Sequence, residues 1–159
     1  MLAPVEELRP GLWTWTAPHP EWHEQPVVRS YAVEREGALV LIDPLSPPVE
    51  LLAGRELRVA LTCPWHARSA PELGATEAEL ESRPGFFPDE RVFWLEEHRA
   101  LVFGDSFPGR AIPDEWLPEG KTREDYRAWF RPLLELPVTL LLPTHGDPET
   151  RERPQRASI

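Results

Sequence analysis

Cysteine and lysine are almost absent from this chain of 159 residues, since each occurs once, as Cys63 and Lys121. A single cysteine excludes an internal disulfide and fits a reducing compartment, so we expect a cytoplasmic protein. The net charge is −10, from 17 basic and 27 acidic residues. Because nucleic-acid surfaces need clustered basic side chains, this charge argues against a nucleic-acid-binding function.

Long apolar runs are missing as well. No run approaches the ~20 apolar residues of a membrane span, and residues 1–7 lack the basic and apolar stretches of a secretory signal. A hydrophobic fraction of 41% is still enough for a core, and the length suits one domain. We therefore expect a single domain over residues 1–147 that does not bind a membrane, followed by a flexible, charged tail over residues 148–159.

Twenty prolines and nine glycines predict many short elements with sharp ends. Apolar, β-branched runs predict strands at residues 12–16, 27–34, 38–42, 58–62, 91–95, 100–103 and 138–142. Glu36 and Gly37 predict a tight hairpin between two of these strands. Helices are expected at residues 47–53, 69–80 and 122–136, and Thr122 suits the N-cap of the last one. Strands, then a helix-bearing stretch, then strands again predict layered α/β packing.

Polar groups follow several of the predicted strands. Asp43 ends one strand, the segment T-C-P-W-H-A-R at residues 62–68 ends the next, and two later strands are followed by Asp105 and by His145. A further segment, P-G-F-F-P-D, occupies residues 84–89. The side chains in these segments that could bind a metal ion are Cys63, His66, Asp105 and His145.

The order of these segments resembles the metallo-β-lactamase superfamily over residues 12–147. That family carries a Thr-His-x-His-x-Asp-His loop, a Pro-Gly-His-Thr-Pro-Gly loop, a Gly-Asp and a late His-Gly, which together hold one or two metal ions. The resemblance implies an αββα sandwich, shortened at residues 73–83 relative to the family. It also implies that Asp105 matches the bridging aspartate, His145 the last histidine, and Asp43 the aspartate that supports the site from below.

Several ligands of the family pattern are missing here. Aligned without a gap, Cys63 and Trp65 fall at the first two histidines, Ala67 at the aspartate and Arg68 at the last histidine. In the second loop, Phe86 replaces another histidine.

A shift by one residue would instead place His66 at the second histidine, and the sequence leaves both registers open. A dinuclear centre is not expected in either case. One zinc or other divalent ion could bind through His66, Asp105 and His145, with Cys63 as a further candidate ligand.

Arg68 supplies a competing hypothesis in which no metal cofactor is bound. Its guanidinium would lie beside Asp105 and balance the carboxylate that a metal neutralises in the family. A buried carboxylate without a partner costs several kcal/mol, and an arginine with two hydrogen bonds avoids that cost. On this hypothesis the metal site is rebuilt as a salt bridge.

His19 and His23 form a second histidine pair, in a proline-rich stretch around Trp22. They could fold over the site, although a surface loop anchored by Trp22 is the favoured interpretation. Two functions remain open, because fold alone does not decide function. The missing ligands favour a non-hydrolytic binding or regulatory protein with a small-molecule ligand, and the alternative is a metal-dependent hydrolase with a one-metal site. A purely structural subunit is a third possibility.

Overall fold

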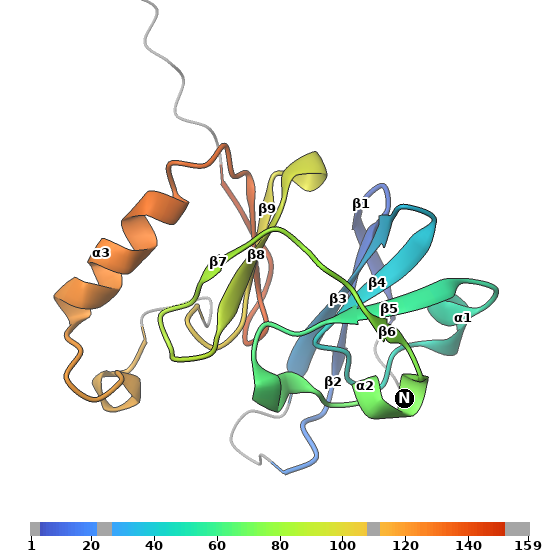
Figure 1. Cartoon of the computed structure of the whole chain (residues 1–159), viewed down its shortest axis with the longest axis horizontal. Coiled ribbons are helices and arrows are strands. Elements are labelled where there is room, and N and C mark those ends of the chain that lie inside the picture. The colour runs from blue at the N-terminus through green and yellow to red at the C-terminus, as the bar shows by residue number, and fades with distance from the viewer. Residues whose placement is uncertain (1–3, 22–26, 108–111, 152–159) are drawn as a thin grey trace, which may run out of the picture.

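The computed structural model describes residues 4–21, 27–107 and 112–151, and there two β-sheets pack face to face with helices on both outer sides (Figure 1). This is the αββα sandwich that the sequence predicted. Among these residues, no helix has both the length and the apolar character that crossing a bilayer requires.

The first sheet has the order β1-β2-β3-β4-β5-β6. Strands β1 to β4 are antiparallel neighbours, and β5 and β6 then join in parallel. The hairpin between β3 and β4 has the positive φ angles at Glu36 and Gly37 that a tight turn requires. The strands are β1 (Glu6–Arg9), β2 (Leu12–Ala17), β3 (Val28–Arg35), β4 (Ala38–Ile42), β5 (Glu56–Ala60) and β6 (Thr76–Glu77).

The second sheet has the order β11-β10-β9-β8-β7. Its central pair, β9 and β10, is parallel, and the other neighbours are antiparallel. The strands are β7 (Ser82–Pro84), β8 (Arg91–Leu95), β9 (Ala100–Phe103), β10 (Leu140–Pro143) and β11 (Glu149–Thr150). Strand β11 lies in the segment predicted as a tail, whose residues 152–159 are outside the described part of the chain.

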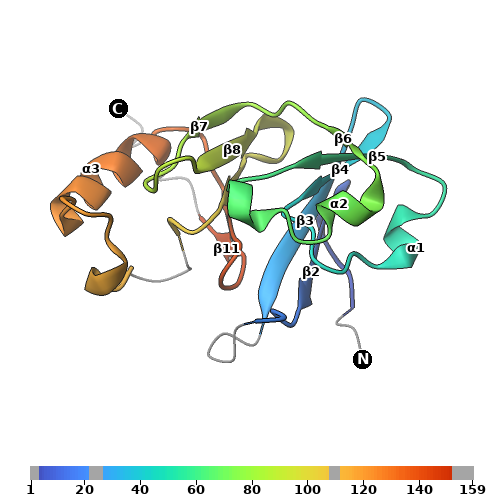
Figure 2. The ribbon, with the colours of Figure 1, turned by 60° about the horizontal axis from the view of Figure 1, so that its bottom comes forward.

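Alternation along β4 shows how the layers are built. Val40 and Ile42 face the second sheet, whereas Leu39 and Leu41 face the helices α1 (Val49–Leu52) and α2 (Ala70–Leu73). Figure 2 shows both helices on the side of the first sheet that is away from the second. All residues of β4 are buried, because both faces of the sheet are covered here. This explains why the strand is a continuous apolar run in the sequence.

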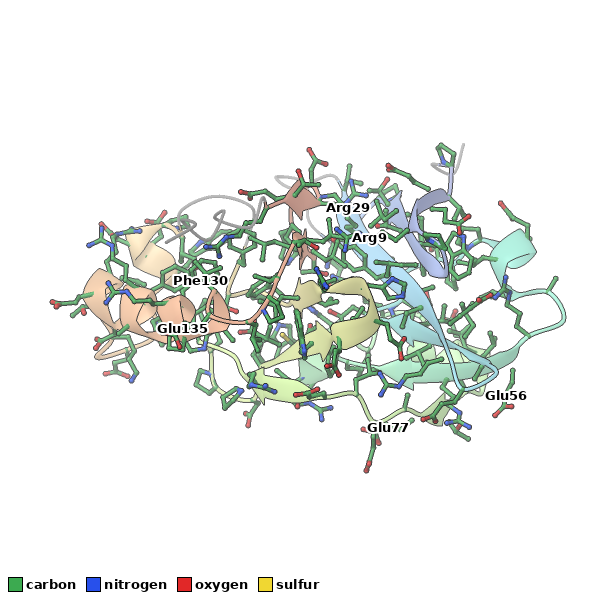
Figure 3. The ribbon with its side chains drawn as sticks, turned by 90° about the horizontal axis from the view of Figure 1, so that it is seen from above. Arg9, Arg29, Glu56, Glu77, Phe130 and Glu135 are labelled. Atoms are coloured by element: carbon green, nitrogen blue, oxygen red, sulfur yellow. The ribbon has the colours of Figure 1, made fainter. Side chains whose placement is uncertain are left out.

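Helix α3 (Arg123–Leu133) covers the outer face of the second sheet. Thr122 caps it, because its side chain accepts from the amide of Asp125 while the Asp125 carboxylate accepts from the amide of Thr122. Phe130 packs from α3 onto the cluster around Phe103 of β9 (Figure 3). The predicted cap of this helix is confirmed.

Several predicted boundaries are wrong, and two of them have a clear local cause. The helix expected at residues 69–80 ends at Leu73, because Gly74 adopts a left-handed conformation with φ of 59° and turns the chain into β6. Strand β5 ends at Ala60 rather than at Thr62, because the amide of Thr62 donates to the side chain of Asp43 and leaves the sheet ladder. This departure starts the functional site.

Candidate metal centre

Four strand ends meet where the two sheets adjoin. The parallel pairs β4–β5 and β9–β10 each bring two carboxyl ends to one edge. Asp43 follows β4, residues 61–68 follow β5, Asp105 follows β9 and His145 follows β10. The two sheets are joined here by hydrogen bonds from the amide of Arg29 to the carbonyl of Thr144 and from the Tyr31 hydroxyl to the carbonyl of Pro143.

Asp43 is a buried carboxylate with partners at both oxygens. Its Oδ1 atom accepts from the amide of Thr62 at 2.8 Å, and its Oδ2 atom accepts from the Thr62 hydroxyl. The same Oδ2 atom lies 3.0 Å from Nδ1 of His66. These contacts fix the His66 ring, so that its Nε2 atom points away from Asp43. The structure therefore brings Asp43 into the supporting position that the family resemblance implied.

His66 lies between two carboxylates. It sits in the short 3-10 helix Pro64–His66, and its Nε2 atom is 3.1 Å from Oδ1 of Asp105. Burial acts to lower the pKa of His66, but hydrogen bonds to Asp105 and Asp43 outweigh burial and raise this pKa to about 11. In the metal-free chain His66 is thus an imidazolium that balances both acids.

Asp105 is the meeting point of three side chains. Its Oδ1 atom lies 2.9 Å from Nε2 of His145 and also contacts His66, and its Oδ2 atom accepts from the indole N–H of Trp65 at 2.7 Å. Burial acts to raise the pKa of Asp105, but the hydrogen bonds from His145 and His66 hold it well below its usual range. The predicted convergence of Asp105 and His145 is confirmed.

Cys63 completes a group of side chains that could hold a metal ion, the candidate metal-binding group. One ligand atom from each of Cys63, His66 and Asp105 lies within 4.8 Å of the other two. Cys63 is fully buried, and this burial raises the pKa of its thiol. His145 is in contact with the group through Asp105. All four side chains that the sequence singled out as candidate ligands are therefore brought together.

Arg68 does not take the place that the sequence suggested. Its Nη1 atom donates to the backbone carbonyls of Asp43 at 2.7 Å and Arg29 at 3.2 Å, and its Nη2 atom donates to the Thr144 hydroxyl at 3.2 Å. Between Arg68 and Asp105, both within the described residues, there is no ion pair. The predicted Arg68–Asp105 salt bridge is wrong.

The reason is that Asp105 is already surrounded. Its two oxygens are engaged by Trp65, His66 and His145, so the positive charge beside it is the imidazolium of His66. Arg68 has a φ of 47° at a position that is not glycine, and its side chain is used to join the ends of β3, β4 and β10. A cation does replace the metal charge in the metal-free chain, but it is a different residue.

Phe86 packs away from the metal-binding group. Its ring centroid is 5.2 Å from that of Tyr126 and 5.8 Å from that of Trp129, both on α3. Phe86 therefore fixes its loop to the helix. Trp65 differs, because its indole is half exposed and holds Asp105 from the solvent side.

Glu90 is a buried acid of the site that the sequence analysis missed. Its Oε2 atom accepts from the amide of Ser106 at 2.8 Å and lies 3.9 Å from the sulfur of Cys63, and its Oε1 atom accepts from the amide of Phe86 at 3.1 Å. Burial raises the pKa of Glu90 to about 7, although the contacts with Ser106 act in the opposite direction. The one signal in the sequence was an acid directly before the apolar strand β8.

Glycines make room for the Glu90 carboxylate. A Cβ atom on Gly85 would lie 2.0 Å from Oε1 of Glu90. A Cβ atom on Gly104 would lie 2.7 Å from both the Cys63 sulfur and the Thr62 hydroxyl. The backbone therefore passes so close to the site that it has no space for a side chain at either position.

A pocket of about 510 Å³ opens beside the metal-binding group. Asp105 and His145 contribute its polar lining. Its remaining lining is mostly apolar and aromatic, from Trp65, Phe87, Pro88, Asp89 and Trp116. The arrangement can hold a small molecule against the metal-binding group.

His19 lies near enough to the site for its charges to act on it. Burial lowers the pKa of His19. The charges of Arg68, His145 and His66 lower this pKa further, and Arg68 has the largest effect of the three. His23 and Trp22 lie outside the described residues. The favoured surface loop anchored by Trp22 and the alternative, in which the pair folds over the site, both stay predictions.

Comparisons with known proteins identify the fold. No protein-family model matches the sequence, and no curated protein is similar to it at a significant level. A metallo-β-lactamase from Erythrobacter litoralis, solved with β-mercaptoethanol in its active site, has a TM-score of 0.61 and 15% identity over 92% of this chain and 90% of that one. VMB-1 also has a TM-score of 0.61, with 12% identity over 94% of this chain and 91% of its own.

A metallo-β-lactamase family protein from Thermus thermophilus has a TM-score of 0.56 and 14% identity, over 91% of this chain and 76% of that one. Identities this low show a shared fold and carry no argument about substrate. They agree with the two-sheet arrangement predicted from the order of the sequence segments.

Proposed function

Because the chain has the metallo-β-lactamase fold, we propose that it binds one zinc-type metal ion and hydrolyses a small molecule held in the adjacent pocket. Cys63, His66 and Asp105 would hold the ion, and His145 would complete the set. The observation that carries this proposal is the approach of three ligand atoms to within 4.8 Å of one another. A reduced cysteine ligand also suits the cytoplasm, where we place the protein.

The donor set fits such an ion chemically. Thiolate, imidazole and carboxylate are the groups that zinc takes in proteins. In metal sites the second nitrogen of a ligating histidine is commonly held by a carboxylate, and Asp43 holds Nδ1 of His66 at 3.0 Å in this way. The indole of Trp65 engages Oδ2 of Asp105, which leaves Oδ1 facing the histidines.

The pocket supports a catalytic use of this site. A zinc ion, when bound, lowers the pKa of water from ~15.7 towards ~7. Asp105 and His145 line the pocket, so a molecule there lies against the proposed ligands. Trp65 and Phe87 supply apolar walls against which the molecule would pack.

A non-hydrolytic binding protein without metal is the second candidate. The contacts of His66 favour this candidate, because Nδ1 lies beside the carboxylate of Asp43 and Nε2 lies beside that of Asp105. These contacts balance the acids without an ion. The pocket would then bind its ligand without chemistry.

Metal analysis separates the two candidates. We expect about one equivalent of zinc or a similar ion in protein purified without chelator, and its loss in Cys63→Ser and His66→Ala. His98→Ala is the matched control, because it removes a histidine on the hairpin between β8 and β9 without touching the site. Metal-dependent turnover of chromogenic esters, thioesters or lactams would support hydrolysis. Metal-free wild-type protein that binds small molecules in the pocket would support the second candidate.

A further inference from the structure

The pocket beside the metal-binding group has unusually exposed aromatic walls. Trp65 is 52% exposed and Trp116 is 41% exposed, and both line the pocket together with Phe87 and Pro88. Large apolar side chains are seldom left open to water without a binding role when they gather around one cavity. A volume of about 510 Å³ suits a small molecule.

The charged side chains of the pocket are acidic. Asp89 and Asp105 line it, and no lysine or arginine does so among the residues that the structure describes. An anion entering this pocket would gain no lysine or arginine partner from the described lining, and it would lie beside the acidic side chain of Asp89. The pocket therefore disfavours carboxylate, sulfonate and phosphate groups.

Asp89 is the acidic residue of this pocket lining that is open to solvent. Its side chain is exposed, in contrast to Asp105, which is engaged by Trp65 and two histidines. A carboxylate next to exposed indole faces attracts organic cations, because the ring faces carry negative charge density.

We propose that the ligand of this pocket is a small aromatic molecule that carries an ammonium group. Its ring would contact Trp65, Trp116 and Phe87, and its cationic group would lie near Asp89. The inference rests on the proposed function for any reaction of this ligand, but the charge preference follows from the pocket walls alone.

A bound metal ion does not reverse this preference. A divalent ion held by the Cys63 thiolate and the Asp105 carboxylate brings two positive charges to two negative ones. The charge of Arg68 is directed into hydrogen bonds with the carbonyls of Asp43 and Arg29, outside the pocket lining. Asp89 therefore remains an acidic side chain of the lining with or without the ion.

Three probes that share a benzyl group test the proposal: benzyltrimethylammonium, benzyl alcohol and phenylmethanesulfonate. Their affinities would be measured by calorimetry and tryptophan fluorescence, with the protein as purified and after chelation. We expect the cation to bind at least about tenfold more tightly than the sulfonate in both forms. Trp116→Leu should weaken the cation and the alcohol alike.

Asp89→Asn isolates the charge. It should weaken binding of the cation by about three- to tenfold and leave benzyl alcohol unchanged. Glu79→Gln makes the same change in net charge at an exposed position outside the pocket lining, and it should leave all three affinities unchanged. Sulfonate binding as tight as that of the cation, or no binding of any probe at millimolar concentration, would overturn the proposal.

Metal content in the same samples separates this result from the proposed function. Charge selectivity in a protein that holds no metal would refute the metal centre and support the ligand class. One equivalent of metal without charge selectivity would refute the ligand class and leave the metal centre intact.

Discussion

His66 and Asp43 form a buried pair in which Nδ1 of the imidazole lies 3.0 Å from Oδ2 of the carboxylate. Asp43 is buried away from the pocket, and its oxygens are engaged by His66 and Thr62. Its part in the site is therefore to orient the histidine. This relationship leads to the first prediction.

Asp43→Asn should weaken metal binding by about 10- to 100-fold, because the ring of His66 loses its anionic partner. Affinity would be measured by competition with a chromophoric chelator. Asp147→Asn is the control, since Asp147 is an exposed acid that forms an ion pair with Arg29 and does not contact His66. Equal affinities of Asp43→Asn and wild type would mean that Asp43 serves the fold alone.

Arg68→Ala should destabilise the fold by about 2–3 kcal/mol, because it removes three hydrogen bonds by which a partly buried guanidinium joins β3, β4 and β10. The free energy of unfolding would be measured by denaturant titration. Arg127→Ala, on the exposed face of α3, should change it by less than about 0.5 kcal/mol. A melt of Arg68→Ala identical to wild type would contradict the structural role assigned to the guanidinium.

Glu90 should make the metal-free protein less stable as the pH rises from about 4.5 to about 7. Its folded pKa of about 7 lies above the ordinary value of 4.5, so the unfolded chain releases its proton first in this window. The loss could reach ~3 kcal/mol, since each pKa unit is worth about 1.4 kcal/mol. Unfolding titrations of wild type and Glu90→Gln across this range would measure it.

The informative quantity is how the difference in unfolding free energy between Glu90→Gln and wild type changes with pH. Glu90→Gln does not titrate, so its stability relative to wild type should improve between pH 4.5 and 7 and level off above. Gln is a poorer partner for the two amides that Glu90 binds, so the variant can still be the less stable protein at low pH. A constant difference across this range would show that Glu90 keeps its ordinary pKa.

Gly104→Ala should destabilise the protein by about 1–3 kcal/mol through overpacking. The added Cβ atom would meet the Cys63 sulfur at 2.7 Å and a Glu90 oxygen at 2.9 Å. Both neighbours are buried and hydrogen-bonded, so they cannot move aside freely. Unfolding and metal content would be measured together, and both stability and metal content should fall. Wild-type values for both would show that the side chains around Cys63 can move to accommodate an added methyl group.

Sequence patterns predicted the frame of this molecule well where one local rule was decisive. The apolar run at 38–42 is a strand covered on both faces, and Thr122 caps its helix, because burial and capping depend on residue type and spacing alone. Strand ends also predicted the meeting of Asp105 and His145, since carboxyl ends of parallel strands share an edge.

Side-chain partners across the fold were not accessible from the sequence in the same way. The orientation of Arg68 depends on a positive φ angle, which cannot be predicted from the presence of an arginine in the sequence. Glu90 was missed because an acid before a strand is usually solvated, and its burial results from two glycines, Gly85 and Gly104, that leave room for its carboxylate. Strand β11 likewise depends on pairing with β10 rather than on its own composition.

The four proposed ligands are divided between the two sheets, with Cys63 and His66 after β5 and Asp105 and His145 after β9 and β10. The distances between the ligand atoms therefore depend on the relative position of the two sheets. A change of shape in the interior between the sheets, for example at Phe93, would tilt one half of the site against the other. Metal affinity in this protein should thus respond to mutations in the core that lie far from any ligand.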